Sequence, residues 1–399
     1  MAVRVSKPAF NLRDELNQLN PPIGAHGGQL MKSSSPEETF NLVGTGRRNV
    51  IINGCMRFNQ RGAASYDGNN VVTLDRWKYN RSTDGEFDIK QSTVAPDGFS
   101  HSLHLDCKAA DSNATPSSGV YGRLRYHIEG QDVQRFCKGK SSAKNFCLSF
   151  YVKSNTLGTY AVNLQDSTNS RIIGRTYEVK NDGWNRYTLV FPNETTNAIT
   201  SNNSSGLEIQ FFFVAGSNRT SGNNTQWSAW HETKNAYGHT AHADNSTSNN
   251  IYLTGVQLEV GDTATPFEHR SYGEELALCE RYCQKYGDGW WFTAYHRGAG
   301  YSEYGYGMLP LRTTMRSGSI TVSAQGDNLH GYRYVPGGYR TAQLGSGRTA
   351  SHIVTSGTQS NQMVSVRIQW QSGHGWSNDD IVHYMSSDAD TFLILSAEL

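Results

Sequence analysis

Residues 251–286, IYLTGVQLEVGDTATPFEHRSYGEELALCERYCQKY, decide the fold because an alternating segment runs through a turn into an amphipathic one. In the first half, side chains at every second position share one face, as a half-buried strand requires. The residues on this predicted face are Tyr252, Thr254, Val256, Leu258 and Val260. Gly261 and Asp262 then end the run, because both favour turns. The first half therefore predicts a strand that closes a domain.

The second half of this stretch has the spacing of a helix. Leu276, Cys279 and Cys283 recur three and four residues apart, which places them on one helical face. The charged residues predicted on the solvent side are Glu274, Glu275, Glu280 and Arg281. We therefore expect a short helix over residues 273–286 that opens the next domain.

The same stretch resembles phage tail-fibre and virion-appendage proteins, in which a GVQLExGxxATPFExR strand end precedes a YxxELxLCxRY helix. The matching residues are Gly255, Val256, Gln257, Leu258, Glu259, Gly261, Ala264, Thr265, Pro266, Phe267, Glu268, Arg270, Tyr272, Glu275, Leu276, Leu278, Cys279, Arg281 and Tyr282. NVIINGCMRFNQRG (residues 49–62) and LDRW (74–77) resemble the opening of the jelly-roll domains that precede this junction. FLILSAEL (392–399) resembles the strand that ends such chains. The resemblance covers residues 46–290 and, more loosely, the remainder. It implies a virion structural protein with a carbohydrate-binding-like sandwich, and it brings no catalytic residues.

Composition indicates an all-β protein of more than one domain. A chain of 399 residues suits two or three domains. The 21 Tyr, 15 Phe, 8 Trp and 40 Gly favour many short strands joined by tight turns. We expect residues 1–45 to form a virion-anchoring segment with a short helix and a linker. Residues 46–270 are expected to form a jelly-roll β-sandwich, and residues 271–399 a β-rich domain.

Charge and hydropathy exclude several partners. The 36 basic and 35 acidic residues leave no positive field for a phosphate backbone, so we expect no nucleic-acid binding. No run approaches the roughly eighteen apolar residues that cross a bilayer, and the N-terminus lacks a secretion signal, so no membrane insertion is expected. Six scattered cysteines are too few for a disulfide scaffold. The resemblance then implies a virion location after assembly in the host cytoplasm.

The N-terminal 45 residues differ from the rest. Leu12, Leu16 and Leu19 form an apolar stripe that predicts about two helical turns, stopped by the prolines at 21 and 22. Because so short a helix needs a docking partner, we expect this stripe to anchor the chain to another virion protein or to associate in threes. The alternative is a disordered arm. Residues 23–39, rich in Gly and Ser, predict an extended connector.

Strand signals recur through both β-rich regions. In the first they cover residues 146–153, 160–164, 185–191, 207–214 and 251–260, with 207–214 predicted as a central strand buried on both faces. Residues 215–250 form a polar loop far longer than a hairpin needs, which is typical of a functional or mobile loop. In the second region they cover residues 319–323, 363–370 and 391–395. Because its long Gly- and Ser-rich runs limit its core, we predict that this region packs as a homotrimer.

The polar loop carries the candidate ligand-binding residues. A Trp face can lie on a sugar ring while neighbouring amides bind its hydroxyls. The candidate glycan-binding residues are Asn224, Gln226, Trp227 and Trp230. The alternative, which the usual burial of Trp favours, is that both tryptophans fill the edge of the sandwich.

We predict no metal site and no cofactor. His231, His239, His242 and Asp244 could hold a divalent ion, but loop histidines usually have no such role. Cys279 and Cys283 lack a second pair of ligands. Loop Asp and Asn residues could hold a structural calcium, as in the jelly-rolls that this region resembles, yet no ordered ligand spacing supports this.

The function expected is adhesion of a phage tail or head fibre to host surface glycans, without enzymatic turnover. No GxSxG, HExxH or P-loop motif occurs, and no β-helix repeat is present. The first alternative is a purely structural capsid-decoration or connector component. The second is a glycan depolymerase, which would need a pair of carboxylates around a cleft.

Overall fold

The computed structural model describes residues 25–32, 39, 47–113, 115–287, 291–296, 304–317, 319–325, 329–335, 338–343, 353–355, 363–369, 381–386 and 392–399. The chain divides into two compact units, Met1–Arg48 and Asn49–Leu399. The boundaries expected after residues 45 and 270 stay predictions. The anchoring stripe of Leu12, Leu16 and Leu19 lies outside the described residues.

In the first unit, Ala25–Lys32 form helix α2. The extended connector predicted over residues 23–39 is therefore wrong for this part. Lys32 in the last turn favours the helix, because a cation there complements the negative end of the helix dipole. Two adjacent glycines within α2 oppose it, so intrinsic propensity does not account for the helix.

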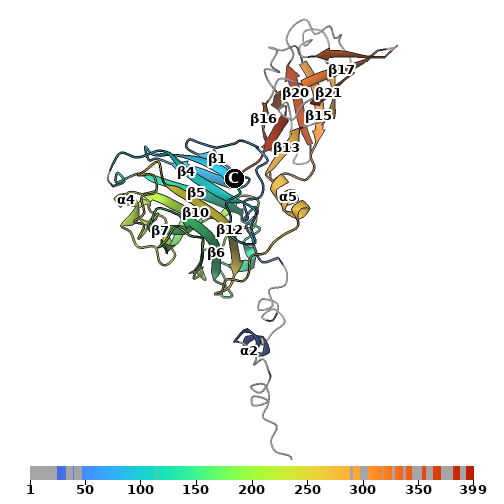
Figure 1. The fold of residues 1–399 in the computed structure, drawn as a ribbon. Helices are drawn as coiled ribbons and strands as arrows, with labels where there is room; N and C mark the ends of the chain where they lie inside the picture. Colours follow the sequence, from blue (N-terminus) through green and yellow to red (C-terminus); the bar gives the residue numbers. More distant parts are fainter. Residues whose placement is uncertain are drawn as a thin grey trace, which may run out of the picture. The chain divides into compact units, whose positions relative to one another are not determined.

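The second unit begins with a sandwich of two antiparallel sheets (Figure 1). The first sheet has the strand order β1 (Val71–Val72), β2 (Trp77–Arg81), β5 (Tyr121–Glu129), β10 (Ser205–Ala215), β7 (Gly158–Asp166), β8 (Arg171–Val179) and β11 (Ser228–Ala229). The second has the order β3 (Glu86–Ser92), β4 (Ser102–Ala109), β12 (Asn250–Val260), β6 (Phe146–Ser154) and β9 (Asn185–Phe191). The short helices of the sandwich are η1 (Gln134–Phe136), α4 (Ser217–Thr220) and η2 (Glu232–Lys234). The predicted all-β sandwich is confirmed.

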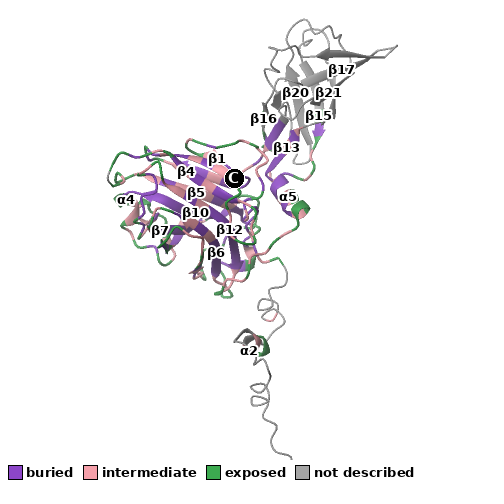
Figure 2. Ribbon diagram, viewed as in Figure 1, coloured by how far each residue is buried: buried purple, intermediate pink, exposed green. Residues whose placement is uncertain are grey.

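Aromatic side chains between the two sheets make up much of the core. Trp77 of β2 lies 5.0 Å from Tyr126 of β5, and Phe150 of β6 lies 5.1 Å from Phe211 of β10, measured between ring centroids. All four are almost completely buried. Each such side chain stabilises the fold by roughly 1.5–3 kcal/mol through loss of apolar surface from water. Buried residues run along β6, β10 and β12 (Figure 2).

Strand β10 is the central strand predicted from residues 207–214. It pairs with β5 on one side and β7 on the other, and nearly every residue in it is buried. Phe211 enters the core between the sheets, whereas Phe212 packs on the opposite face with Ala161, Ala215 and Ala236. Burial on both faces explains the apolar run over residues 211–214, whereas Glu208 and Gln210 alternate with apolar residues before it.

Strand β12 contains an irregularity that the sequence did not reveal. Its pairing with β6 shifts register between Thr254 and Gln257, and Gly255 there has a φ of 62°. Ile251 and Leu253 face the core before this bulge, and Val256 and Leu258 face it afterwards. The predicted face is therefore wrong in its first half, because a β-bulge moves each later side chain to the other face.

The junction segment forms a helix shorter than predicted. Ser271 is the N-cap of helix α5 (Tyr272–Glu280), and its side chain accepts a hydrogen bond from the backbone N–H of Glu274. Strand β13 (Cys283–Gly287) follows, so the helix expected to reach residue 286 ends early. Glu275 and Glu280 are buried rather than exposed, because Glu275 pairs with Arg270 and Glu280 pairs with Arg312. Cys279 and Cys283 are therefore four residues apart without sharing a helix, since Cys279 belongs to α5 and Cys283 begins β13.

The described part of the chain after β13 is also rich in strands. A three-stranded sheet has the order β13, β22 (Phe392–Ser396) and β16 (Thr321–Gln325). A seven-stranded sheet has the order β18 (Gly338–Gln343), β17 (Leu329–Val335), β21 (Ile381–Ser386), β14 (Trp291–His296), β15 (Tyr304–Pro310), β20 (Met363–Gln369) and β19 (Ile353–Thr355). Strands β16, β20 and β22 overlap the three segments predicted in this region.

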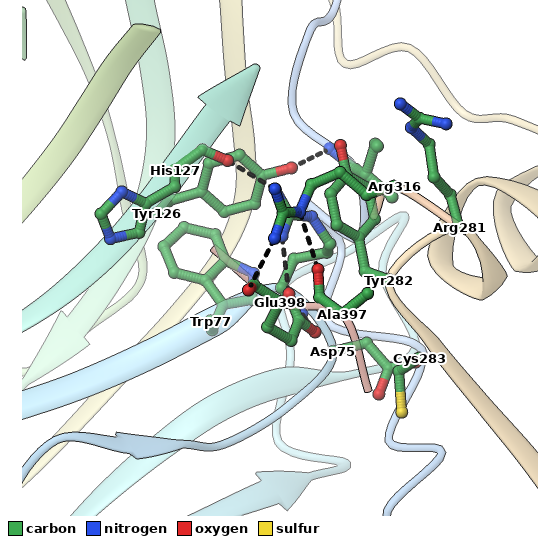
Figure 3. A network of polar contacts seen from close by, with 12 residues as sticks. Asp75, Trp77, Tyr126, His127, Arg281, Tyr282, Cys283, Arg316, Ala397 and Glu398 are labelled. Atoms are coloured by element: carbon green, nitrogen blue, oxygen red, sulfur yellow. Dashed lines mark hydrogen bonds and ion pairs between the residues drawn. The ribbon is translucent and has the colours of Figure 1, made fainter. Parts of the chain in front are cut away.

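A buried polar network links the three-stranded sheet to the sandwich (Figure 3). Arg76, just before β2, pairs with Glu398 at 2.6 Å, and its guanidinium lies 3.4 Å from the ring centroid of Tyr282. Arg281 pairs with the buried Glu129 at the end of β5, at 2.8 Å. These contacts join segments far apart in the sequence and fix α5 and the end of the chain against the sandwich.

Candidate functional site

The long loop over residues 215–250 packs against the outer face of the first sheet. Asn163 of β7 donates a side-chain hydrogen bond to the carbonyl of Asn235. Ala236 packs with Ala161 of β7 and Phe212 of β10. The loop therefore has an apolar base on the sheet, and it carries exposed residues above that base.

Trp227 lies at the edge of the sandwich. Its indole N–H donates to the carbonyl of Pro192 at 2.8 Å, and its ring packs against the core near Phe146, 6.2 Å away. The Lys138 ammonium lies 4.6 Å from the ring centroid. This placement matches the alternative in which Trp227 fills the edge of the sandwich.

Trp230 is different, since 44% of its surface is exposed. Its indole N–H donates to Oδ1 of Asn235 at 3.0 Å, and its backbone N–H donates to the carbonyl of Ser170. The polar edge of the indole is thereby fixed while the ring stays accessible. An aromatic ring held in this way can stack on the apolar face of a sugar.

The two amide candidates also differ in exposure. Asn224 is 2% exposed, and its Nδ2 donates to Asn163 and to the carbonyl of Lys234. It therefore positions the loop on the sheet. Gln226 is exposed beside Trp227. Glycan binding by these four residues stays a prediction.

The outer face of the first sheet carries a second group of polar side chains, which the sequence analysis did not identify. We call this group the polar strip. In adjacent positions across β2, β5, β10 and β7, one row consists of Lys78, Arg125, Gln210 and Asn163. The row beside it consists of His127, Glu208 and Gln165. Asn80 pairs with Arg123 in the next row.

Hydrogen bonds connect the polar strip. Arg125 donates to both carboxylate oxygens of Glu208, at 2.5 and 2.9 Å. Gln210 donates to Gln165 at 2.8 Å and accepts from Arg123 at 3.0 Å. The strip is thus a preorganised array of amide, carboxylate and guanidinium groups on a sheet, which is a rigid support.

Burial sets the charge of the strip. Burial alone would raise the pKa of Glu208, but hydrogen bonds from Arg125 hold it below its usual value. Burial lowers the pKa of His127 to about 4, so its imidazole is neutral at pH 7. Burial lowers the pKa of Arg123 to about 10, which leaves its guanidinium charged. Counting Lys78, Arg123 and Arg125 against Glu208 gives three minus one, a net charge of +2.

Trp230 is connected to the polar strip through Asn235. Its partner Asn235 accepts a hydrogen bond from Asn163, and Asn163 lies opposite Gln210 in the sheet. Buried hydrogen bonds therefore connect the exposed loop residue Trp230 to the array on the sheet, since Asn163, Asn235 and Gln210 are each no more than 1% exposed. Arg123, Arg125 and His127 alternate with apolar residues along β5, and this pattern in the sequence indicates a polar face. The sequence does not indicate which strands lie beside β5.

Cavities also occur elsewhere among the described residues of the sandwich. One of about 130 Å³ lies between β8 and the long loop, lined by Gly174, Arg175, Thr176, Asn224, Thr225, Tyr237 and Gly238. Another, of about 290 Å³, lies near the start of α5. Phe99, Phe267 and His269 line it and pack together with centroid separations between 4.9 and 5.3 Å.

The histidines considered as metal ligands separate in the structure. His231 is exposed and accepts from the backbone N–H of Thr233, which caps η2. His239 is buried and accepts at Nδ1 from the backbone N–H of Ala161, an arrangement that requires this nitrogen to be unprotonated. His242 and Asp244 lie together with Asp111, a residue that the sequence analysis did not consider.

The six cysteines form no disulfide in the described part of the chain. Cys107, Cys147, Cys279 and Cys283 are buried, as expected of thiols that pack as small apolar side chains. Among the described residues, no helix has the length and apolar character needed to cross a bilayer.

No protein-family model matches the sequence, and no curated protein matches it. Among solved structures, the chain is similar to the enzymatically active domain of tailspike protein 4 of bacteriophage CBA120, with a TM-score of 0.29, 14% identity and coverage of 53% of this chain and 21% of that one. It is also similar to the family 11 carbohydrate-binding module of the cellulase Lic26A-Cel5E of Clostridium thermocellum, with a TM-score of 0.26, 10% identity and coverage of 53% and 99%. A third is TmCBM61 in complex with β-1,4-galactotriose, with a TM-score of 0.27, 9% identity and coverage of 54% and 99%. The chain spans about a fifth (21%) of the length of the tailspike chain.

Proposed function

We propose that this protein is a bacteriophage virion appendage, a tail or head fibre, that adheres to host surface glycans through the polar strip and Trp230. The observation that carries the proposal is the exposed indole of Trp230, which donates to Asn235, the residue whose carbonyl accepts from Asn163 of the strip. The junction motif in residues 255–282, which resembles that of phage appendage proteins, supports the virion location.

The chemistry of the surface suits a sugar. The strip residues that are partly exposed are Lys78, Arg123, Arg125, His127 and Gln165, whereas Glu208, Gln210 and Asn163 are buried. The exposed guanidinium, ammonium and amide N–H groups can donate to sugar hydroxyls. The ring of Trp230 offers an apolar face beside these polar groups. Because Arg125 and Glu208 are already paired, binding adds contacts without first ordering the side chains, which lowers its entropic cost.

We propose binding without turnover. A glycosidase needs two carboxylates, one of which acts as a general acid with a raised pKa. Within the polar strip, Glu208 is the one carboxylate, and its pKa is held low by Arg125 despite burial. Incubation of host glycans with the protein is therefore expected to release no reducing ends.

Weak single sites become useful through multiple copies. We propose that residues 271–399 assemble as a homotrimer and that residues 1–45 attach it to other virion proteins. Three linked sites raise the avidity by a factor set by their effective concentration. Light scattering on the purified full chain is expected to give the mass of a trimer, and a stable monomer would contradict this part of the proposal.

The test is binding of the full chain to immobilised host surface polysaccharide, compared between the natural sequence and Trp230→Ala. We expect at least a tenfold loss of affinity, since one stacked aromatic contributes roughly 0.5–1.5 kcal/mol per site beyond its area and three sites act together. Tyr272→Ala is the matched control, because Tyr272 is another exposed aromatic residue, on α5, with 54% of its surface exposed against 44% for Trp230. Equal losses for both variants, or none for Trp230→Ala, would contradict the proposal.

A purely structural role is the second candidate. The buried network between Arg76, Glu398, Arg281 and Glu129 favours it, because a rigid junction suits a component that transmits load between neighbours. A structural component predicts no binding to host polysaccharide by the assembled chain, and burial of the long loop against another virion protein.

A further inference from the structure

Three potential ligand atoms converge beside the end of β4 and the start of β12. Asp111 follows β4, while His242 and Asp244 precede β12. Nε2 of His242 lies 3.0 Å from Oδ1 of Asp244 and 3.8 Å from Oδ2 of Asp111. The exposed fractions are 4% for Asp111, 9% for His242 and 0% for Asp244.

The imidazole of His242 has no hydrogen-bond partner at either nitrogen among the described residues. Although Nε2 approaches Asp244 to 3.0 Å, the two groups are not aligned as a hydrogen bond. A buried polar group without a partner lowers the stability of the fold by roughly 1–3 kcal/mol, so a ligand that binds this side chain would remove that cost.

Each carboxylate has one oxygen engaged and one facing the histidine. Oδ2 of Asp244 accepts from the hydroxyl of Thr83 at 2.6 Å, whereas Oδ1 is buried and has no hydrogen bond. Oδ1 of Asp111 accepts from the backbone and side-chain amides of Asn113, at 3.0 and 2.7 Å. The engaged oxygens hold both carboxylates in place. Oδ1 of Asp244 and Oδ2 of Asp111 are therefore oriented toward Nε2 of His242.

We propose that Asp111, His242 and Asp244 bind one divalent transition-metal ion, of which Zn²⁺ is the representative. Nitrogen and oxygen ligands lie about 2.0–2.2 Å from zinc, so two ligands of a tetrahedral ion are roughly 3.3–3.5 Å apart. The separations of 3.0 and 3.8 Å bracket this value. Imidazole nitrogen favours such an ion over Ca²⁺ or Mg²⁺, which prefer oxygen ligands.

The ion would act as a structural clip. None of the three residues lines either cavity or belongs to the polar strip. The two aspartates also join through the backbone, where the N–H of Asp111 donates to the carbonyl of Asp244 at 2.7 Å. An ion here would tie the end of β4 to the base of the long loop, with water as a fourth ligand. The site was not visible in the sequence, since Asp111 lies 131 positions before His242.

The test uses the untagged full chain, stripped with a chelator and titrated with Zn²⁺ by calorimetry. We expect one saturable site per chain with a dissociation constant at or below the micromolar range. His242→Gln and Asp111→Asn should each weaken that site by at least tenfold. His231→Gln is the matched control, because His231 is an exposed histidine of the same loop, and it should leave binding unchanged.

Substitution with Co²⁺ adds a readout that does not depend on the variants folding. The natural sequence is expected to give the visible absorption of a tetrahedral site, displaced by one equivalent of Zn²⁺. Absence of a stoichiometric site in the natural sequence would overturn the proposal. So would full retention of that site in Asp111→Asn, whose fold is checked by circular dichroism.

Discussion

The carboxylate of Glu398 lies 2.6 Å from the guanidinium of Arg76, although 322 residues separate them in the sequence. Arg76 also donates to the carbonyl of His127 at 2.5 Å and lies over the ring of Tyr282. Burial alone would raise the pKa of Glu398, but Arg76 and Arg61 hold it below its usual value. This pair joins the end of β22 to the sandwich and makes the two parts interdependent.

Glu398→Gln is expected to destabilise the protein by about 3 kcal/mol, because removal of one partner leaves the charge of Arg76 buried and uncompensated. Denaturant unfolding, with the free energy extrapolated to water, measures the loss. Glu86→Gln is the control, since the Glu86 side chain that pairs with Arg81 is 40% exposed and such a pair contributes about 1 kcal/mol or less. Equal small losses would show that the Arg76 pair does not hold the junction.

Gly255→Ala tests the bulge in β12. A Cβ at this position would lie 2.8 Å from ring atoms of both Phe99 and Tyr151, on a backbone with φ of 62°. Both the contact and the left-handed backbone oppose the methyl group, so we expect a loss of roughly 2 kcal/mol or more. Gly273→Ala in α5, where nothing lies within 4 Å, should instead stabilise by up to about 1 kcal/mol. An unchanged free energy of unfolding in Gly255→Ala would contradict the requirement for glycine at the bulge.

Acid should weaken the sandwich through His127. Burial lowers its pKa to about 4 in the folded protein, with Arg125, Arg76 and Lys78 adding to the effect and Glu208 opposing it. In the unfolded chain the group titrates near pH 6.5. Since the folded pKa is the lower one, the stabilisation is complete above about pH 6.5 and is lost as the pH falls toward 4. Across this pH range, the shift in the pKa of His127 changes the free energy of unfolding by about 3 kcal/mol.

Unfolding free energies measured between pH 7 and 4 check this prediction. The unfolding free energy of His127→Gln should decline less steeply with falling pH than that of the natural sequence. The part of the decline that stays is expected from the buried His239, whose pKa burial also lowers to about 4. His231→Gln, in which an exposed histidine is replaced, should keep the natural slope. An unchanged slope in His127→Gln would contradict burial of a neutral imidazole.

The net charge of +2 on the polar strip predicts a preference for acidic glycans. Affinity for a polysaccharide with carboxylate groups should fall as sodium chloride rises from 50 to 500 mM, because salt screens the partly exposed charges of Lys78, Arg123 and Arg125. Affinity for a neutral polysaccharide should change little over the same range. Calorimetric titrations in both series make the comparison, and identical salt responses would argue against contact with Arg125 and Arg123.

The spacing of apolar residues and the composition were sufficient to predict the sandwich and its central strand, because the residues of β6, β10 and β12 that are buried are mostly apolar. The phase change at Gly255 was not predictable, since a bulge depends on how β6 pairs beside it. Cys283 kept helical spacing but belongs to β13, where pairing with β22 overrides local preference.

The candidate site was only partly predictable for the same reason. Trp230 stood out as an aromatic residue in a polar loop, and its exposure was not visible from spacing alone. The polar strip depends on β5, β10 and β7 lying side by side, although 205–215 and 121–129 are far apart in the sequence. Asp111 likewise reaches His242 only through the pairing of β4 with β12.

Hydrogen–deuterium exchange of the full chain, with and without host surface polysaccharide, tests the proposed adhesion most directly. The account predicts slower exchange in peptides from β5, β7 and β10 and in residues 228–236, with no change around β3 and β9. Polysaccharide binding that leaves these peptides unprotected would contradict the account.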